Sequence, residues 1–381
     1  MKASNLKIAI DARMYGLEHT GIGKYIMELT LKLAEIDHIN NYILILREKF
    51  YKSLAFPENF KKVKGEFRQY SLKEQLLLPK ILEREKPDLV HFPHFNVPIF
   101  YRGNYIVTIH DLLMHKQKGF QATTLTPAVY MIKRQGYRLV FDTAVSHAVK
   151  IIVPSQSVKK ELVNYYNLNP EKVAVTYEGV SDLGADNSKE RNIEKYNIKK
   201  PFFIFIGNAY PHKNLKRLVE AILALNTERD EKAMLIIVSA RNIFINKLEG
   251  LISDLKAGAY VKILGFLPDK EVGSLYRNSS AFVFPTTSEG FGIPGLDAFN
   301  AGTLVLASEI PVLKEIYKKH AIYFNPFDFS SIVKAMETAL SMSKEERDAR
   351  IAESKDFVKV YSWNKMAQET LAIYEDCASL R

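Results

Sequence analysis

Residues 288–297 read SEGFGIPGLD, and this stretch decides the fold of the chain. It follows the apolar run 281–285 and opens a predicted helix, in which Pro294 suits the first position. A strand, a glycine-rich loop and a helix N-terminus together favour a phosphate, because backbone N–H groups and the helix dipole point toward it. Glu289 and Asp297, eight residues apart, would repel that phosphate, so we expect them to accept hydrogen bonds from sugar hydroxyls. A nucleotide sugar offers both kinds of group.

Length and composition restrict the class of protein. A chain of 381 residues exceeds one hydrophobic core and predicts two domains. Its apolar runs are too short to span a bilayer, and Asp11 interrupts the first run, so no secretory signal is predicted. The single cysteine, Cys377, excludes internal disulfides and cysteine-based metal clusters. We therefore expect a cytoplasmic protein, with peripheral attachment to the inner face of the membrane as a further option.

The positive charge is concentrated in the first half of the chain. Residues 1–180 hold 26 Lys and Arg against 17 Asp and Glu, whereas residues 181–381 hold 27 against 26. Such an excess either only aids solubility or attracts an anionic partner, such as nucleic acid, a phosphorylated acceptor or an acidic membrane surface.

Short apolar runs alternate with helical patterns along the chain. The predicted strands are 7–11, 42–46, 88–92, 105–110, 150–154, 173–176, 202–206, 234–238, 261–264, 281–284, 304–307 and 322–324. The predicted helices of the second half are 215–225, 245–255, 270–277, 294–301 and a long region 344–377. Near-continuous apolar strands are typical of parallel sheets covered on both faces. Because the polar stretch 181–200 separates two such series, we predict an α/β protein of two Rossmann-like βαβ domains that face each other across a cleft.

A second loop, GNAYPHKN at 207–214, follows the predicted strand 202–206. Lys213 lies just before a predicted helix, where its charge could neutralise a departing phosphate. Taken alone, the loop would be better explained by a solvated lysine in a turn. Its place on the same predicted sheet as the Glu289 loop favours the functional interpretation.

The first half contains weaker candidates. Gly21 and Gly23 would let the backbone approach a phosphate, but the full GxGxxG pattern is absent and a plain turn fits equally well. His110 ends a predicted strand, where it could orient or polarise a substrate hydroxyl or simply cap a loop. His91 and His94 could line the same cleft or pack in the core.

The region 112–139 combines cations with apolar side chains. The basic residues Lys116, Lys118, Lys133, Arg134 and Arg138 are interleaved with Leu112, Leu113, Met114, Phe120, Tyr130, Met131 and Leu139. The pattern fits an amphipathic surface for an anionic membrane, or an ordinary charged helix face over a core. No nucleic-acid-binding motif accompanies the charge, so nucleic acid is not expected as a partner.

Taken together, the motifs resemble those of the retaining glycosyltransferases of family 4, which have the GT-B fold. The loop 289–297 resembles the E-x7-E signature of that family. Further motifs follow in the order of the family, namely IDAR at 10–13 with GIGKY at 21–25, TIHDL at 108–112, VPS at 153–155 and GNAYPHKN at 207–214. The resemblance covers essentially the whole chain and is specific for the family, though not for its substrate. The YPHKN loop looks most like that of mannosyltransferase members.

The resemblance implies roles by position. Lys213 would stabilise the diphosphate, Glu289 would bind the hydroxyls of the donor sugar, and His110 would lie near the reacting carbon. Asp297, where the family usually has glutamate, would accept hydrogen bonds from the ribose. The other implied donor-binding residues are Gly21, Gly23, Asn208, Gly265, Phe266, Leu267, Gly290, Phe291, Gly292 and Ile293.

Two further implications concern cations and domain boundaries. Asn208 stands where many relatives have an arginine, for which Arg217 or Arg241 could substitute. No metal cofactor is expected, since family members need none and the chain lacks an Asp-x-Asp pair. The resemblance also implies that the helix 363–381 crosses back onto the first domain, which gives domains of 1–183 with that helix and 184–362.

The expected function is retaining transfer of a hexosyl group from a nucleotide diphosphate sugar. GDP-mannose is favoured over a UDP-sugar, and the acceptor would be a sugar or a lipid-linked hydroxyl in polysaccharide, lipopolysaccharide or glycolipid synthesis. Two alternatives stay open. One is a nucleotide-sugar epimerase or hydrolase on the same fold, and the other is a basic, non-enzymatic membrane or nucleic-acid adaptor.

Overall fold

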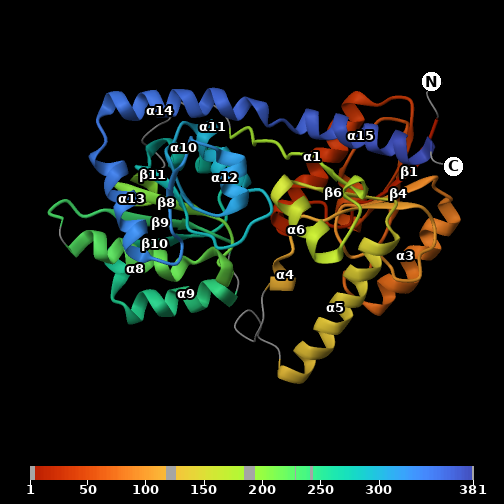
Figure 1. Cartoon of the computed structure of the whole chain (residues 1–381), viewed down its shortest axis with the longest axis horizontal. Helices are drawn as coiled ribbons and strands as arrows, with labels where there is room; N and C mark the ends of the chain where they lie inside the picture. Colours follow the sequence, from red (N-terminus) through yellow and green to blue (C-terminus); the bar gives the residue numbers. More distant parts are fainter. Residues whose placement is uncertain (1–4, 117–125, 184–193, 228, 241–242, 380–381) are drawn as a thin grey trace. The chain divides into compact units, whose positions relative to one another are not determined.

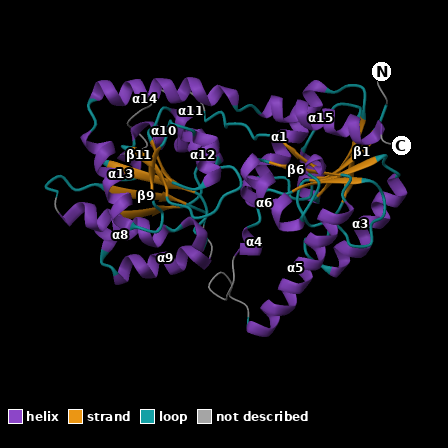
Figure 2. Ribbon diagram, viewed as in Figure 1, coloured by secondary structure: helices purple, strands orange, loops and turns teal. Residues whose placement is uncertain are grey.

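The computed structural model describes residues 5–116, 126–183, 194–227, 229–240 and 243–379 (Figure 1). The chain folds as two compact units. The N-terminal unit comprises residues 1–179 together with 362–381, and the C-terminal unit comprises residues 180–361. Each unit is an α/β fold built on its own parallel sheet (Figure 2).

The sheet of the N-terminal unit has seven parallel strands in the order β3-β2-β1-β4-β5-β6-β7. Its strands are β1 (Lys7–Asp11), β2 (Asn41–Leu46), β3 (Phe60–Lys64), β4 (Leu89–Phe92), β5 (Tyr105–Thr108), β6 (Lys150–Val153) and β7 (Val173–Val175). Strand β3 was not predicted, because its sequence FKKVK buries only Phe60 and Val63 and exposes lysines at the edge of the sheet.

The helices of this unit are α1 (Thr20–Ile36), α2 (Glu48–Ser53), α3 (Leu72–Glu85), α4 (Leu113–Lys116), α5 (Pro127–His147), α6 (Gln156–Tyr166) and α15 (Trp363–Ser379). Helix α1 begins at Thr20, so Gly21 and Gly23 lie in its first turn. The plain turn that the sequence allowed at these glycines is therefore replaced by the first turn of a helix. Burial of Tyr25, Leu29 and Leu33 along one face holds the helix on the unit.

The sheet of the C-terminal unit has six parallel strands in the order β10-β9-β8-β11-β12-β13. Its strands are β8 (Phe202–Ile206), β9 (Met234–Val238), β10 (Val261–Leu264), β11 (Ala281–Phe284), β12 (Val305–Ser308) and β13 (Ile322–Phe324). Its helices are α8 (Leu215–Thr227), α9 (Ile243–Asp254), α10 (Asp269–Asn278), α11 (Ile293–Ala301), α12 (Pro311–Tyr317), α13 (Phe329–Ser341) and α14 (Lys344–Phe357). The central strands β8 and β11 are buried almost throughout, as their continuous apolar sequences predict.

The predicted helical region 344–377 consists of two helices that belong to different units. Helix α14 lies in the C-terminal unit, and after a short 3-10 turn at Val358–Val360 the chain passes into α15 of the N-terminal unit. A buried chain of hydrogen bonds fixes α15 to the sheet. Tyr374 Oη lies 2.7 Å from His91 Nδ1, and His91 Nε2 lies 2.8 Å from the hydroxyl of Thr108. Burial lowers the pKa of His91 to about 3, so this histidine is a neutral core residue.

In both sheets the strand order reverses between the first strand and the fourth. The reversal lies between β1 and β4 in the N-terminal unit and between β8 and β11 in the C-terminal unit. In open parallel sheets the loops at the carboxyl ends of such a strand pair diverge, and ligands bind in the crevice that they leave. The two reversals therefore define where each unit can hold a ligand.

Candidate functional site

At the reversal of the C-terminal unit, the loops after β8 and β11 bring two opposite charges together. Lys213 Nζ donates to Glu289 Oε1 over 2.5 Å, although the two residues are far apart in sequence. Their side chains are only 15% and 13% exposed, and Lys213 Nζ also lies 5.2 Å from the centre of the Phe284 ring. The two residues predicted to matter most therefore form one site.

Backbone contacts hold these loops in place. Lys213 ends a 3-10 turn, Pro211–Lys213, and Asn214 then adopts the left-handed conformation with φ 59°. The buried amide of Asn214 donates to the carbonyl of Pro285, 3.1 Å away, and to that of Pro326, 2.7 Å away. Thr287 N in turn donates to the carbonyl of His212 over 2.8 Å. The lysine therefore projects from a rigid support, as electrostatic catalysis requires.

The glycine-rich loop after Glu289 leads into α11 through a position that only glycine fits. Gly292 has φ +109°, and a Cβ there would lie 2.5 Å from the hydroxyl of Tyr317. Tyr317 Oη donates to the carbonyl of Gly292. Burial, followed by the charge of Glu289, raises the pKa of Tyr317 well above its usual range. Tyr317 thus shapes the loop from below, and nothing in the sequence indicated this role.

His212 is a further group beside the pair that the sequence analysis did not single out. Its Nδ1 is buried and has no hydrogen-bond partner in the described structure. Burial and the neighbouring Lys213 charge lower its pKa to about 4, so the ring is neutral at physiological pH. A neutral imidazole with an unsatisfied nitrogen is suited to hydrogen-bond a polar ligand.

Asp297 lies on α11 and is 9% exposed. Its two carboxylate oxygens accept hydrogen bonds from Ser181, from the backbone N–H over 2.7 Å and from the hydroxyl over 2.6 Å. Asn300 donates to the carbonyl of the same serine. Asp297 therefore holds the segment that enters the C-terminal unit. The predicted contact of Asp297 with ribose stays a prediction.

The other predicted donor-binding residues of this unit differ in exposure. Phe291 is 3% exposed and packs edge-on against Tyr361, so its side chain is part of the core. Phe266, in the loop after β10, is 67% exposed, whereas Leu267 is buried. Gly265, Gly290, Ile293 and Asn208 also lie in loops or first turns after β10, β11 and β8. Arg217 of α8 lies over the ring of Phe327. Arg241 lies outside the described residues.

In the N-terminal unit the two candidate glycines have different environments. A Cβ on Gly23 would lie 1.9 Å from the carbonyl oxygen of Gly16, so packing of α1 alone requires this glycine. A Cβ on Gly21 would have no neighbour within 4 Å, and this residue is exposed. Packing within the N-terminal unit therefore requires glycine at position 23 but not at position 21.

Both ring nitrogens of His110 have partners. Nε2 lies 3.0 Å from the carbonyl of Pro93, and Nδ1 lies 3.3 Å from Glu178 Oε1. The ring also packs edge-on against Tyr25 at 5.0 Å. With both nitrogens facing acceptors, the ring of His110 is held in place by the protein. Glu178, which orients it, carries no recognisable sequence motif.

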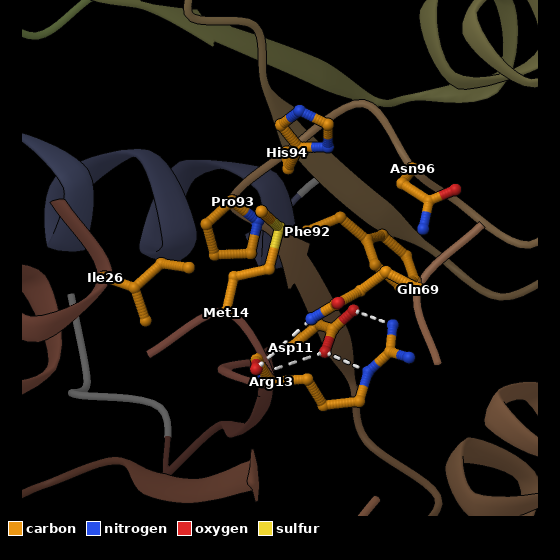
Figure 3. A pocket seen from close by; sticks show the side chains of 9 residues that line it. All are labelled: Asp11, Arg13, Met14, Ile26, Gln69, Phe92, Pro93, His94 and Asn96. Atoms are coloured by element: carbon orange, nitrogen blue, oxygen red, sulfur yellow. Dashed lines mark hydrogen bonds and ion pairs between the residues drawn. The ribbon is translucent and has the colours of Figure 1, made fainter. Parts of the chain in front are cut away.

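A small pocket lies at the reversal between β1 and β4 (Figure 3). Its lining residues are Asp11, Arg13, Met14, Ile26, Gln69, Phe92, Pro93, His94 and Asn96. In Figure 3, Asp11 and Arg13 lie on one side of Met14 and Pro93, and His94 lies on the other side. Burial lowers the pKa of His94 to about 3, so it contributes a neutral ring. The pocket therefore combines apolar walls with mostly neutral polar groups.

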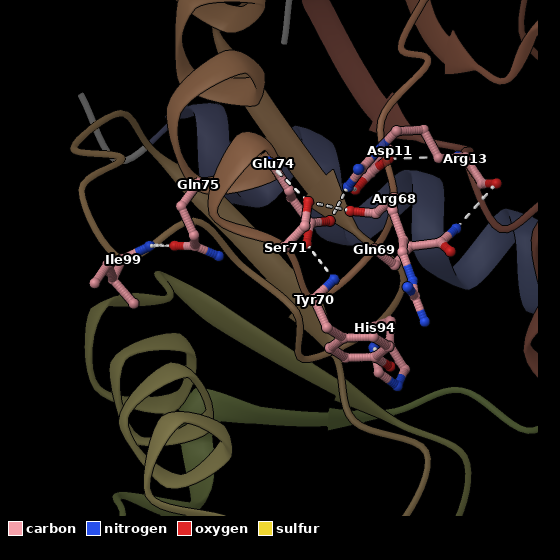
Figure 4. A network of polar contacts seen from close by, with 10 residues as sticks. All are labelled: Asp11, Arg13, Arg68, Gln69, Tyr70, Ser71, Glu74, Gln75, His94 and Ile99. Atoms are coloured by element: carbon pink, nitrogen blue, oxygen red, sulfur yellow. Dashed lines mark hydrogen bonds and ion pairs between the residues drawn. The ribbon is translucent and has the colours of Figure 1, made fainter. Parts of the chain in front are cut away.

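Arg13, which lines this pocket, is paired with two carboxylates (Figure 4). Arg13 donates to both oxygens of Asp11, over 2.7 and 2.6 Å, and to Glu74 Oε1 over 2.6 Å. Burial opposes the charge of Arg13, yet the two carboxylates outweigh it and raise the pKa of its guanidinium. Glu74 also accepts a bond from the backbone of Tyr70. The network fixes the pocket wall, and of its members only Asp11 and Arg13 belong to a motif quoted above.

Two properties of the described residues bear on cofactors and membranes. No group of three or more His, Cys, Asp or Glu side chains among them is arranged to hold a metal ion. None of the helices in the described ranges has an apolar stretch long enough to cross a bilayer.

Comparison with known proteins follows the same division of the chain. The family model for Glycosyltransferase Family 4 matches residues 20–182, and that for Glycosyl transferases group 1 matches residues 186–356. The O-antigen chain mannosyltransferase RfbU of Salmonella typhimurium is 26% identical over 293 residues, 77% of this chain and 75% of that protein. The O-antigen chain mannosyltransferase B of Escherichia coli is 23% identical over 375 residues, 93% and 96% of the two chains.

Among solved structures, the sucrose-phosphate synthase of Thermosynechococcus elongatus superimposes with a TM-score of 0.78. It shares 15% sequence identity and covers 99% of this chain and 100% of its own. At this identity the likeness establishes the fold alone. Together, the two family models, the mannosyltransferase relatives and the shared fold show that the chain belongs to glycosyltransferase family 4, as a mannosyltransferase-like member with the GT-B fold.

Proposed function

We propose that the chain is a retaining mannosyltransferase that transfers mannose from GDP-mannose to a hydroxyl of a saccharide or lipid-linked acceptor in surface-polysaccharide synthesis. The observation that carries this proposal is the Lys213–Glu289 pair at the strand-order reversal of the C-terminal unit. The choice of mannose is supported by the relatives, which are named O-antigen mannosyltransferases.

The pair supplies two complementary groups for a nucleotide diphosphate sugar. The lysine charge would move from Glu289 to the diphosphate, and the freed carboxylate would accept hydrogen bonds from the sugar hydroxyls. Because Lys213 is mostly buried over Phe284, its charge acts at reduced dielectric and is poorly screened by solvent. The two residues would thereby hold both sides of the bond that must break.

In the proposed reaction, the bond between the sugar C1 and the departing phosphate oxygen breaks. The acceptor oxygen forms its bond to C1 on the same face, which retains the configuration. The acceptor proton passes to an oxygen of the leaving diphosphate, so no protein base is needed. This route is consistent with His110, whose two nitrogens face protein acceptors. We assign His110 the role of a positioned, polar wall near C1.

We place the acceptor sugar against the small pocket of the N-terminal unit, whose volume of about 10 Å³ admits one hydroxyl-sized group rather than a whole sugar. A sugar presents hydroxyl groups at its edge and C–H groups on its faces, and the pocket offers both kinds of partner. Gln69, His94 and Asn96 can exchange hydrogen bonds, whereas Met14 and Phe92 provide apolar contact.

The test is a donor and acceptor matrix. Purified protein is incubated with GDP-mannose, UDP-glucose or UDP-N-acetylglucosamine, with and without a bacterial lipid extract, in EDTA. We expect nucleotide release only with acceptor, fastest from GDP-mannose and insensitive to the chelator, and an α-mannosyl product by NMR.

Other results of the same assay would contradict the proposal in distinct ways. Nucleotide release without acceptor would indicate a hydrolase, and a changed free sugar nucleotide would indicate an epimerase. A β-linked product would exclude retention. Loss of turnover in EDTA that Mg²⁺ restores would exclude the metal-independent route.

A further inference from the structure

Exposed apolar side chains are concentrated on two helices of the N-terminal unit. On α5 they are Val129, Met131, Ile132 and Leu139, which are 42%, 53%, 73% and 57% exposed. At the start of α3 and in the loop after β4 they are Tyr70, Leu72, Leu76 and Phe100, which are 62%, 83%, 59% and 64% exposed. We call these eight residues the apolar patch. Such a concentration of large apolar groups at the surface usually marks an interaction site.

Helix geometry shows that the α5 residues form a stripe turned away from the core. Val129, Ile132 and Leu139 follow one another at intervals of three and seven residues, so they lie along one side of the helix. Phe141 and Ala144, in the second half of the helix, are fully buried in the unit. Helix α5 thus packs on the unit through its second half, and the apolar stripe runs along the exposed side from Val129 to Leu139.

The segment of sequence that carries the stripe contains cations but no acidic residue. The sequence between Asp111 and Asp142 contains no Asp or Glu. Lys133 and Arg138 are exposed on α5 beside the stripe. Lys116 ends α4, and Lys118 of the predicted basic region lies outside the described residues.

Helix α3 carries exposed charges of both signs beside its apolar residues. Lys73, Lys80 and Glu83 are exposed, whereas Glu74, the acidic residue of its first turn, is buried and paired with Arg13. The patch is therefore apolar, with a cationic margin on α5 and charges of both signs on α3.

The patch is connected to the proposed acceptor pocket. Helix α5 leads from the carboxyl edge of the sheet back to β6, so its exposed first half lies toward the same edge as the pocket; in Figure 1 this half extends away from the sheet. Tyr70 packs edge-on against the pocket residue His94 at 6.0 Å, and Phe95 lies 4.9 Å from Tyr137 of α5. Continuous aromatic contacts therefore join patch and pocket.

We propose that the apolar patch docks onto the surface of an anionic lipid bilayer. The stripe would enter the boundary between headgroups and acyl chains, while the lysines and arginines meet the anionic headgroups. A nucleic acid would satisfy the cations but leave the stripe in water. The need for a lipid surface rests on the proposed lipid-linked acceptor, whose sugar would reach the pocket beside the patch. The docking itself can be tested without donor or acceptor.

The first experiment measures flotation of the full-length protein with phosphatidylcholine vesicles, with and without phosphatidylglycerol. Leu139→Glu places a charge in the stripe, and Ile39→Glu is the matched control, since Ile39 is 56% exposed on the same unit and lies outside the patch. We expect Leu139→Glu to weaken binding to the anionic vesicles about tenfold or more, because one buried leucine side chain is lost. Ile39→Glu should bind like the wild type, and circular dichroism should show both variants folded.

The second arm removes charge from the margin. Neutralising Lys133, Arg134 and Arg138 together to Gln should weaken binding to anionic vesicles about a hundredfold, at roughly fivefold per cation. Binding to pure phosphatidylcholine should change little, and high salt should reproduce the effect of the triple variant.

Three outcomes would overturn the proposal. The first is anionic-vesicle binding by Leu139→Glu at the wild-type level, which would mean that the cations act without the stripe. The second is an equal loss in Ile39→Glu. The third is a wild-type dimer in sedimentation that Leu139→Glu dissociates, which would make the patch a contact between copies.

Activity and binding assays together distinguish a failure of the docking proposal from a failure of the proposed function. Transfer to an acceptor dissolved in detergent should be unchanged in Leu139→Glu, while transfer to the same acceptor in vesicles should fall with binding. Vesicle binding without any nucleotide release would support docking and contradict the transferase proposal. Nucleotide release without any vesicle binding would do the reverse.

Discussion

The two units share a sheet topology but use charge at its reversal point in opposite ways. The C-terminal unit holds a Lys213–Glu289 pair that solvent and ligands can still reach, at 15% and 13% exposure. In the N-terminal unit the side chains of Arg13 and Glu74 are 2% and 0% exposed, and their charges pair with each other inside the protein. The same crevice can therefore present a cation that is partly exposed, as Lys213 is, or one that is fully buried among carboxylates, as Arg13 is.

This difference matches the two substrates of the proposed reaction. A nucleotide diphosphate sugar carries negative charge and needs a cation within reach, whereas a sugar acceptor needs neutral hydrogen-bonding groups and apolar walls. Buried charges that are already paired cannot bind a ligand without a large penalty. The position of one ion pair thus separates a donor type of site from an acceptor type.

The largest effect is expected at the Lys213–Glu289 pair. Lys213→Ala and Glu289→Gln should each lower kcat for transfer by about 100- to 1000-fold, since each removes a preorganised charge from the reacting bond. Steady-state nucleotide release measures this effect, and circular dichroism checks the fold. Lys216→Ala is the matched control, because this lysine is 70% exposed on α8 and pairs only weakly with Glu220 at 3.9 Å. Near-normal activity in both site variants would contradict the site assignment.

The buried network should instead respond through stability. Arg13→Met leaves the carboxylates of Asp11 and Glu74 without their partner, which should cost about 3–5 kcal/mol of the stability of the N-terminal unit. Hydrogen exchange of the β1 and β4 amides measures it for this unit alone. Adding Glu74→Gln should recover part of the loss. If Arg13→Met is as stable as the wild type, the network does not hold the pocket.

Substitution of the two glycines in the first turn of α1 distinguishes a packing role from a ligand-binding role. Gly23→Ala should destabilise the N-terminal unit by about 1–3 kcal/mol, because its Cβ would overlap the Gly16 carbonyl. Gly21→Ala should be neutral or stabilising by up to about 1 kcal/mol. A raised KM for the donor in Gly21→Ala, without loss of stability, would support its predicted approach to the diphosphate. An unchanged KM would remove Gly21 from the donor-binding set.

The last effect concerns pH, and it is absent at neutral pH and grows only as the pH falls below about 6.5. The pKa of His91 is lowered from 6.5 to about 3 by burial, so the unfolded chain takes up its proton first as the pH falls. The stability due to this residue is complete above about pH 6.5 and is lost toward pH 3, by about 1.4 kcal/mol per pH unit. His91→Gln should flatten this slope in urea unfolding of the N-terminal unit followed by hydrogen exchange. A slope equal to that of the wild type would show that His91 is not held neutral.

Much of the fold could be predicted from the sequence, because continuous apolar runs of four to six residues are the signature of buried parallel strands. The predicted family and fold are confirmed, and the Lys213 and Glu289 loops meet as expected. The misses have local causes. Strand β3 is an edge strand rich in lysine, and the first turn of α1 contains two glycines, which helix propensity disfavours.

The sequence by itself determined the positions of the strands other than β3, the family and the two residues of the charged pair. Each of these depends on short-range patterns, such as an apolar run followed by a glycine or a lysine before a helix. Only the tertiary structure decided that Asp297 holds Ser181, that Glu178 orients His110 and that Arg13 is paired with carboxylates beside a pocket. These partners are distant in sequence, and their pairing depends on which strands become neighbours. Strand order, rather than local pattern, therefore set which charges stayed available for substrate.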